Sequence, residues 1–358
     1  MAARVMVMAG GTGGHVFPAL AVADELRARG CEVSWLGTPN SFEARVVPQY
    51  GFPVYWVDAY RLRGQSVLGL VLAPLRLARA MLQAWRAIRR LRPQVVLGMG
   101  GFVTGPGGLV AWLTGRPLVV HEQNAVPGLT NQWLARFATR VLEAFPGSFA
   151  AARGAELTGN PVRREIAELP PPAERLAGRG GPCRVLVLGG SLGAAALNET
   201  VPEAVGLLAP DRRPAIRHQA GRDKVGSARR AYAAAGVRAE VSDFVQDMAE
   251  AYGWADLVIC RAGALTLSEL AAAGVGALLV PYPNAVDDHQ TRNAEHLVGA
   301  GAARLLPQAT LGARELAATL RELCTDRAAL RAMAEAARRL ARPHAARHVA
   351  DVCEEVAA

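Results

Sequence analysis

Short apolar runs alternate with longer helical patterns along the chain. The runs are apolar almost throughout, and they span residues 4–9, 32–36, 95–98, 117–120, 184–188, 257–260 and 277–280. Strands that are covered on both faces have this composition, whereas a strand with one face in water alternates between apolar and polar positions. The pattern therefore predicts an α/β fold built on parallel sheets.

The first strand and its glycine turn are repeated later in the chain. Residues 4–11 (RVMVMAGG) resemble residues 184–191 (RVLVLGGS), and a helical pattern follows each. Between the two copies lie the segment 159–163 (GNPVR), the proline run 170–172 and the glycine- and arginine-rich residues 178–182. Few contacts usually cross such segments, so we expect two Rossmann-like halves with a boundary near residues 160–180.

The C-terminal region reads as helical. Residues 313–340 have a helical pattern, Pro343 breaks it, and a last short helix starts at Ala345. We expect this terminal helix to pack back on the first half.

Length and composition fit this organisation. A chain of 358 residues with 51% hydrophobic and 20% charged residues is long and apolar enough for two cores. No uninterrupted apolar run approaches the roughly 20 residues of a spanning helix, and the start reads as a strand rather than a signal peptide. The five cysteines are scattered without a CxxC motif, which favours a reduced cytoplasmic compartment.

The positive charge is concentrated in one part of the chain. Residues 1–163 hold 17 Arg and 8 acidic residues, a net of +9, whereas residues 164–358 hold 23 basic and 23 acidic residues. Nine arginines and no carboxylate lie between Ala59 and His121. Compositional drift would have made both halves basic, so the excess favours an anionic partner, either nucleic acid or acidic lipid.

The spacing of residues 75–91 favours lipid. On a helix, one face carries the predicted core residues Leu77, Met81, Trp85, Ile88 and Leu91, and the other carries Arg76, Arg79, Arg86 and Arg90. Leu75 and Leu82 fall among these arginines, and the apolar residues Val67, Leu68, Leu70, Val71 and Leu72 precede them. Exposed leucines beside arginines suit an interface that is apolar at depth and anionic at its surface.

The first candidate site is the turn 10–15 (GGTGGH) between the first strand and a helix that we expect from Pro18. Glycines let a ligand approach the backbone, and a helix N-terminus attracts anions. The spacing is not GxGxxG, which argues against a dinucleotide-dependent oxidoreductase. The helix dipole disfavours a protonated imidazole at His15, which makes His15 a candidate base. A generic tight turn with a structural histidine is the alternative.

Further polar and glycine-rich segments follow other strands. The turn 98–108 and the cluster 121–124 (HEQN) belong to the first half. The four hydrogen-bonding side chains of the cluster suit sugar hydroxyls, and an ordinary polar loop is the alternative. In the second half, residues 189–194 repeat the glycine turn, and residues 261–269 open a helix whose N–H groups suit a diphosphate. Glu269 suits a ribose diol, or it is simply a first-turn glutamate favoured by the dipole. Residues 281–293 complete the set.

Taken in order, these segments resemble the MurG family of bacterial undecaprenyl-diphospho-muramoylpentapeptide β-N-acetylglucosaminyltransferases. The resemblance runs from Val5 to about Leu306 and includes the segment 159–163. It implies a GT-B fold, with two Rossmann-like domains whose parallel sheets face each other across a cleft. The implied domains are residues 1–163 plus 341–358, which bind the acceptor and the membrane, and residues 164–340, which bind UDP-GlcNAc.

The resemblance also implies the reaction. Such enzymes move GlcNAc from UDP-GlcNAc to the C4 hydroxyl of the muramoyl sugar of lipid I, with inversion, and form lipid II. They use neither a metal nor an organic cofactor, and this sequence has no metal-ligand cluster and no DxD motif. The implied location is the cytoplasmic face of the cell membrane, with the region of Leu75, Arg76, Arg79 and Leu82 on the anionic surface. We expect His15 to act as the base, with Glu122 as the second candidate.

Matching motifs assign the remaining roles as the resemblance implies them. In the first domain, the diphosphate and sugar loop contains Thr12, Gly13 and Gly14, Asn124 contacts GlcNAc hydroxyls, and Asn131 lies on the acceptor side. Gln290 also contacts the GlcNAc hydroxyls, and the nucleotide is contacted by Arg163, Ser191 and the backbone of Val245. The diphosphate helix begins with Ala264, Leu265, Thr266, Leu267 and Ser268, and Glu269 binds the ribose. Phe102 and Leu192 depart from the family's frequent tyrosine and glutamine.

Three rival functions differ in class or acceptor. A GT-B enzyme that acts on another lipid such as diacylglycerol is the nearest one. A nicotinamide or flavin oxidoreductase would need the missing GxGxxG motif. A nucleic-acid-binding module predicts arginines interleaved with exposed aromatic residues and no polar sugar-binding cluster, so we expect no nucleic-acid partner.

Overall fold

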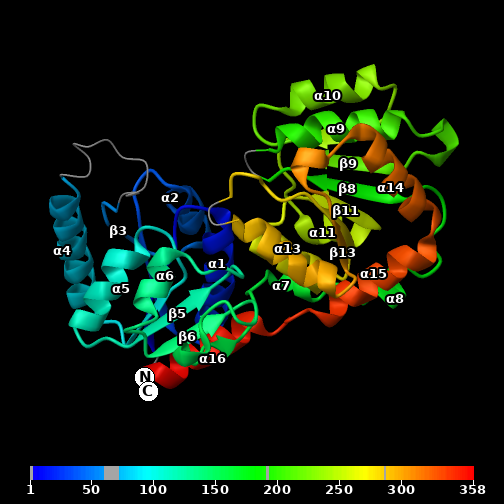
Figure 1. The fold of residues 1–358 in the computed structure, drawn as a ribbon. Coiled ribbons are helices and arrows are strands. Elements are labelled where there is room, and N and C mark those ends of the chain that lie inside the picture. The colour runs from blue at the N-terminus through cyan, green and yellow to red at the C-terminus, as the bar shows by residue number, and fades with distance from the viewer. Residues whose placement is uncertain (1–2, 60–71, 191–192, 286–287) are drawn as a thin grey trace. The chain divides into compact units, whose positions relative to one another are not determined.

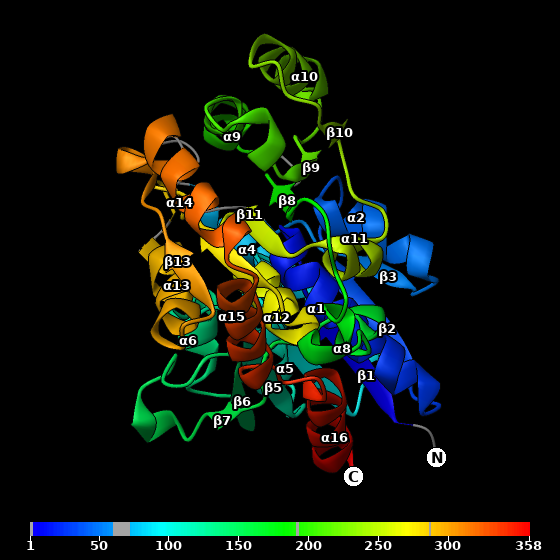
Figure 2. The same ribbon diagram turned by 90° about the vertical axis from the view of Figure 1, so that its right-hand side faces the viewer.

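The chain folds into two compact α/β units in the computed structural model, which describes residues 3–59, 72–190, 193–285 and 288–358 (Figures 1 and 2). Unit 1 comprises Met1–Arg163 and Arg342–Ala358, and unit 2 comprises Arg164–Ala341. Within the described residues, no helix is long and apolar enough to cross a bilayer.

Unit 1 is built on a parallel sheet, as the apolar runs predicted. The described strands lie in the order β3-β2-β1-β4-β5-β6-β7, and every ladder is parallel. Their bounds are β1 Arg4–Met8, β2 Glu32–Gly37, β3 Val54–Trp56, β4 Val95–Gly98, β5 Leu118–Glu122, β6 Arg140–Glu143 and β7 Glu156–Leu157.

Helices cover both faces of this sheet (Figure 1). Val5 and Val7 of β1 share a core with α1 (Gly13–Ala28) and α16 (Ala345–Ala357), whereas Met6 and Met8 face the opposite core. That second core includes residues of α4 (Ala73–Leu91), α5 (Thr104–Leu113) and α6 (Leu129–Leu134). The short helix α2 (Phe42–Val46) follows β2, and short 3-10 turns span Val47–Tyr50 and Ala151–Arg153.

The terminal helix α16 packs on unit 1. Val349 and Cys353 lie in the same core as α1, and α16 contacts α1 directly. The guanidinium of Arg29 at the end of α1 pairs with Asp351 and Glu354 of α16, both at 2.6 Å. The last 13-residue helix therefore completes a core that begins at Val5 of β1.

The predicted core face of α4 is wrong in part. Ile88 is buried and Met81 and Leu91 are partly buried, but Leu77 and Trp85 are 45% and 36% exposed. The buried positions are instead the alanines Ala80, Ala84 and Ala87. Small side chains let α4 approach α5 closely, and Leu77 and Trp85 point outward. Residues 67–71 lie outside the described part of the chain.

Unit 2 repeats the architecture. Its described strands lie in the order β10-β9-β8-β11-β12-β13, again all parallel. Their bounds are β8 Arg184–Leu188, β9 Ala215–Gln219, β10 Glu240–Ser242, β11 Leu257–Cys260, β12 Gly276–Leu279 and β13 Ala303–Leu305. The helices are α7 Arg164–Ala167, α8 Pro172–Arg175, α9 Ala195–Gly206, α10 Val225–Ala234, α11 Met248–Trp254, α12 Ala264–Ala273, α13 His289–Gly299, α14 Ala313–Thr325 and α15 Arg327–Arg339.

The tail of unit 2 is helical, as expected over residues 313–340, and it consists of two helices, α14 and α15. The break falls at Asp326, whose carboxylate accepts a hydrogen bond from the backbone N–H of Ala329 at 2.9 Å. An aspartate in this extended conformation caps a new helix.

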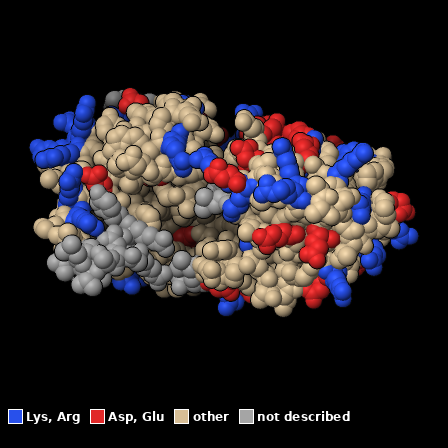
Figure 3. All heavy atoms as spheres, turned by 90° about the horizontal axis from the view of Figure 1, so that it is seen from above, with Lys and Arg blue, Asp and Glu red and all other residues tan. Residues whose placement is uncertain are grey.

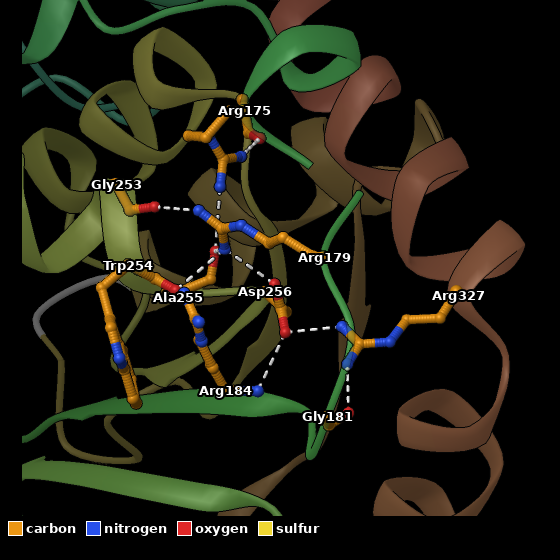
Figure 4. A network of polar contacts seen from close by, with 10 residues as sticks. Arg175, Arg179, Gly181, Arg184, Gly253, Trp254, Ala255, Asp256 and Arg327 are labelled. Atoms are coloured by element: carbon orange, nitrogen blue, oxygen red, sulfur yellow. Dashed lines mark hydrogen bonds and ion pairs between the residues drawn. The ribbon is translucent and has the colours of Figure 1, made fainter. Parts of the chain in front are cut away.

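A buried carboxylate ties the amino ends of several unit 2 elements together (Figure 4). Asp256 precedes β11 and pairs with Arg179 at 2.8 Å and with Arg327 of α15 at 2.7 Å. It also accepts the backbone N–H of Arg184 at 3.0 Å. Burial alone would raise the pKa of Asp256, but these hydrogen bonds outweigh it and hold the pKa below its ordinary value.

Candidate functional site

The first two glycine turns meet at the carboxyl edge of the unit 1 sheet. β1 lies between β2 and β4, so the strand order reverses there, and such switch points bind ligands in open α/β sheets. The backbone N–H of Gly10 donates to the carbonyl of Gly100 at 3.2 Å. A Cβ on Gly101, whose φ is +92°, would lie 2.4 Å from the carbonyl oxygen of Gly10. Only glycine permits this approach.

The second glycine turn is shorter than the sequence suggested. α5 begins at Thr104, so Gly105, Gly107 and Gly108 belong to a helix and not to the expected turn 98–108. A Cβ on Gly107 would lie 2.4 Å from the sulfur of Met8, and one on Gly108 would lie 2.8 Å from Leu134. These two glycines therefore serve close packing of α5 on β1 and α6. Phe102 of the remaining turn is exposed.

Glu43 holds the first glycine turn, and sequence reasoning missed it. Its carboxylate is 1% exposed and accepts the backbone N–H groups of Gly11 at 2.9 Å and Thr38 at 3.0 Å. A Cβ on Gly10 would lie 2.5 Å from this carboxylate. The residue is carried by α2, about 30 positions after the turn, and no spacing motif marks it.

His15 lies in the first turn of α1. The helix begins at Gly13 rather than at Pro18, because Thr12 is extended and its carbonyl accepts the N–H groups of His15 and Val16. Gly13, Gly14 and His15 therefore occupy the helix N-terminus, where backbone N–H groups lack helical acceptors. The imidazole is half-buried, and a Cβ on Gly100 would lie 2.8 Å from its Nδ1 atom. The second glycine turn thus lies directly against the ring.

A chain of hydrogen bonds runs from His15 through two residues of the cluster 121–124, Gln123 and His121. His15 Nδ1 lies 2.8 Å from Gln123 Oε1, and Gln123 Nε2 lies 3.1 Å from His121 Nδ1. His121 Nε2 donates to the carbonyl of Gly159 at 2.9 Å. Burial lowers the pKa of His121 to about 4, so its ring is neutral at physiological pH.

The Glu122 carboxylate makes hydrogen bonds that do not involve His15. Oε1 accepts the backbone and side-chain N–H groups of Asn124, at 2.9 and 3.1 Å. Oε2 accepts from the backbone of Gly128 at 3.1 Å and from the Asn131 amide at 2.8 Å. Glu122 and Asn131 are both buried, and Asn124 is half-buried. The carboxylate therefore organises the loop that follows β5.

Arg163 is the last residue of the first segment of unit 1. Its guanidinium lies 5.6 Å above the ring of Phe17 in α1, and its Nε atom is buried. The side chain is therefore held against the helix that carries His15.

The glycine turn of unit 2 packs on the loop after β9. A Cβ on Gly193, whose φ is +67°, would lie 2.0 Å from the carbonyl oxygen of Ala220. The ammonium of Lys224, the single lysine of the chain, donates to the Gly193 carbonyl at 3.4 Å. Ser191 and Leu192 lie outside the described residues.

The N-terminus of α12 offers a limited set of donors. Gly263 is the extended N-cap, and the N–H of Leu267 already donates to its carbonyl at 3.0 Å. The N–H groups of Ala264, Leu265 and Thr266 precede that bond and lie in the first turn. Leu267 is buried, and the Ser268 hydroxyl donates back to the Ala264 carbonyl at 3.0 Å.

Glu269 and the loop after β12 complete the candidate site of unit 2. Glu269 is 5% exposed, and its Oε2 atom accepts from the hydroxyl of Tyr252 at 3.1 Å. Gln290 in α13 is half-buried, and its Oε1 atom accepts the backbone N–H of Tyr282 at 2.9 Å. Tyr252 was missed by sequence reasoning because it lies on α11, 17 positions before Glu269.

Arg261 and Val245 belong to two further segments of unit 2. Arg261 donates to the carbonyls of Val280 and Pro281, which fixes the start of the loop after β12. Val245 is half-buried beside the exposed Phe244 in the loop between β10 and α11. Among the described residues, no three His, Cys, Asp or Glu side chains are grouped as metal ligands would be.

Comparisons with known proteins match both units. The chain fits the glycosyltransferase family 28 N-terminal domain over residues 5–143 and the C-terminal domain over residues 184–350. A Marinobacter nauticus protein is 56% identical over 354 residues, 99% of this chain and 98% of that protein. Its name is UDP-N-acetylglucosamine–N-acetylmuramyl-(pentapeptide) pyrophosphoryl-undecaprenol N-acetylglucosamine transferase.

Solved structures agree with these matches. The crystal structure of Acinetobacter baumannii MurG has a TM-score of 0.86 and 43% identity, and 99% of each chain is covered. The calicheamicin glycosyltransferase has a TM-score of 0.69 at 17% identity, with 99% of this chain and 98% of that chain covered, and it shows the fold alone. The two-unit α/β fold is therefore GT-B, and the chain belongs to glycosyltransferase family 28.

Proposed function

We propose that this chain transfers GlcNAc from UDP-GlcNAc to the C4 hydroxyl of the muramoyl sugar of lipid I, which forms lipid II for peptidoglycan synthesis. The observation that carries the proposal is the 56% identity to a named N-acetylglucosamine transferase across 99% of the chain, because it spans both units. The Acinetobacter baumannii MurG structure, at 43% identity, supports the same family of enzyme.

Unit 1 supplies the acceptor site and the base. The acceptor hydroxyl attacks C1 of GlcNAc while its proton passes to Nε2 of His15, and the bond from C1 to the diphosphate breaks in the same step. His15 suits this role because it is half-buried beside the two glycine turns. Glu122 is less suited, because both of its oxygens already accept N–H donors and it is buried. Thr12, Gly13 and Gly14 provide open backbone around the reacting sugar.

Unit 2 holds the donor. The first-turn N–H groups of α12, from Ala264 to Thr266, receive the negative charge of the departing diphosphate. Glu269 binds the ribose diol with Tyr252 fixing its carboxylate, and the Gln290 amide contacts GlcNAc. The backbone of Val245 meets the uracil, and Ser191 contacts the nucleotide. Arg163, which belongs to unit 1, is assigned a nucleotide contact by its matching motif alone.

The surface of α4 docks unit 1 on the cytoplasmic face of an anionic membrane. Leu75 and Leu82 are 70% and 46% exposed, and Figure 3 shows basic side chains gathered at the edge where Figure 1 places α4. Trp112 of α5 and Trp133 of α6 are exposed as well and both contact Phe137, and α5 packs on α4. Arg79 pairs with Asp58 at 2.9 Å, so part of its charge is balanced. Tryptophan, leucine and arginine together suit a lipid interface.

The test of the acceptor is a transfer assay. The purified chain is incubated with UDP-[14C]GlcNAc and either a lipid I analogue or diacylglycerol, in detergent micelles. We expect label only in the lipid I product. Label that appears only in the diacylglycerol product would assign the chain to a different lipid acceptor.

A further inference from the structure

The contacts around Gln123 determine which way its amide faces. The Gln123 nitrogen lies 3.2 Å from the backbone carbonyl oxygen of His121, which can only accept a hydrogen bond. The same nitrogen lies 3.1 Å from Nδ1 of His121. The amide nitrogen must therefore face His121, and the amide oxygen must face His15.

The protonation of His121 agrees with this orientation. Its Nε2 atom lies 2.9 Å from the Gly159 carbonyl and must carry a proton to make that bond. A neutral ring then has a bare Nδ1 atom, which accepts from Gln123. The Gly159 carbonyl is fixed in turn, because a Cβ on Gly159 would lie 2.4 Å from the Cβ of Arg342. The Gly159 backbone therefore lies directly against the side chain of Arg342.

These donors and acceptors leave one arrangement for His15. Its Nδ1 atom, 2.8 Å from the Gln123 oxygen, must carry the proton. The proton-free atom of a neutral His15 is then Nε2, which has no hydrogen-bond partner among residues 3–59, 72–190, 193–285 and 288–358. A carbonyl at Gly159 thus sets, through two side chains, which nitrogen of His15 is basic.

We propose that Gln123 and His121 are positioning residues that hold His15 in the Nδ1–H tautomer and so keep Nε2 as the proton acceptor. The proposal deepens the proposed function, because it rests on His15 taking the proton of the acceptor hydroxyl. The orienting group is a neutral amide and not the carboxylate that orients the histidine in many hydrolases. Neither residue touches the reacting atoms.

The test uses two substitutions at Gln123 that differ in whether the new side chain can accept a hydrogen bond from His15. Gln123→Met removes both hydrogen bonds, whereas Gln123→Glu keeps an oxygen toward His15 but no donor toward His121. Gln49→Met, at an exposed position of unit 1, is the matched control. Nitrogen-15 NMR of labelled imidazole reports the tautomer of His15, assigned by comparison with His15→Gln, without any substrate.

We expect the wild type and Gln49→Met to show His15 protonated at Nδ1. In Gln123→Met the Nε2–H form should appear, and kcat should fall by at least about tenfold while KM for UDP-GlcNAc changes by less than about twofold. Gln123→Glu should keep the Nδ1–H form and more turnover than Gln123→Met. A merely structural amide predicts the reverse order, because a carboxylate buried at this position costs more than a thioether.

Three results would overturn the proposal: a wild-type His15 protonated at Nε2, an unchanged His15 tautomer in Gln123→Met, or a Gln123→Glu that is less active than Gln123→Met. If Gln123→Met fails to fold, the wild-type and Gln123→Glu spectra decide alone. The proposed function fails separately, since a wild type that transfers no GlcNAc to lipid I leaves the NMR result standing.

Discussion

His15 and Glu122 are both bases by residue type, and their surroundings separate them. Glu122 accepts four N–H donors and is buried, so its removal would disturb Asn124 in the loop after β5 and Asn131 in α6. Within the described part of the chain, the His15 ring has one hydrogen-bond partner, Gln123, and it is half-buried beside two glycine turns. The contacts therefore suit Glu122 to organising the loop after β5 and His15 to the role of base.

The buried histidines predict how stability depends on pH. Burial lowers the pKa of both His121 and His218 to about 4, below the ordinary value of 6.5. The unfolded chain therefore binds more protons between pH 6.5 and 4, and stability falls as the pH falls through this range. The loss should reach about 3 kcal/mol for each histidine at pH 4.

Urea unfolding at pH 7, 5.5 and 4 checks this prediction. His218→Gln removes one titrating group, so this variant should lose less stability than the wild type over the same interval. Identical pH dependence in the two proteins would show that His218 does not make this contribution.

At the scale of elements, the apolar strands were predictable and the polar ones were not. β1, β4, β8 and β11 are apolar runs that alone indicate burial. β9 was missed because it contains Arg217, His218 and Gln219. His218 is buried there because Tyr232 and Asn198 bond both ring nitrogens, and these partners come from α10 and α9. These partners lie far from His218 in the sequence, so the residues next to His218 do not reveal them.

The candidate site shows the same division. Glycine turns after strands were predictable, because close backbone approach requires glycine. Glu43 and Tyr252 were not, because each supports a site residue from another helix. The large apolar residues of α4 misled the prediction of its core face, since the close contact with α5 selects alanine.

The glycine turn of unit 2 gives a matched pair of substitutions. Gly190 and Gly193 both have positive φ, 78° and 67°, but a Cβ on Gly190 would meet no atom of the described residues within 4 Å. A Cβ on Gly193 would meet the Ala220 carbonyl at 2.0 Å and displace the turn. Gly190→Ala should cost about 1–2 kcal/mol of strain alone. Gly193→Ala should also raise KM for UDP-GlcNAc by about tenfold or more.

Steady-state kinetics and urea unfolding of both variants distinguish strain from displacement. Equal KM values for the two would indicate that the Gly193 turn does not contribute to donor binding.

The Asp256 network predicts a large effect on unit 2. Asp256→Ala leaves Arg179 and Arg327 without their shared carboxylate, so unfolding should become easier by about 3–5 kcal/mol. Glu335→Ala, which removes an exposed pair with Arg331, should change stability by less than about 0.5 kcal/mol. Urea unfolding measures both, and similar values would mean that the buried pairs contribute little.

At the scale of the whole molecule, the uneven charge and the exposed apolar side chains coincide on unit 1. The nine arginines without a carboxylate lie in the stretch that includes α4, whose leucines are exposed. Replacing Leu75 and Leu82 by serine and Arg76 and Arg79 by glutamine should reduce binding to vesicles rich in anionic lipid by at least about tenfold. Binding that survives in a sedimentation assay would place the docking surface elsewhere.

A matched control belongs to unit 2. Arg229 and Arg230 of α10 are exposed, and their replacement by glutamine removes the same number of charges. Vesicle binding should then change by less than about twofold, and an equal loss would indicate an effect of net charge alone.

The most direct test of the central claim, that His15 is the base of a GlcNAc transfer, compares the wild type with His15→Ala. GlcNAc transfer to the lipid I analogue and UDP binding by calorimetry are measured on the same preparations. We expect turnover to fall by about 100- to 10,000-fold, while the Kd for UDP stays within about twofold. Wild-type turnover in His15→Ala would contradict the account and move the role of base to Glu122.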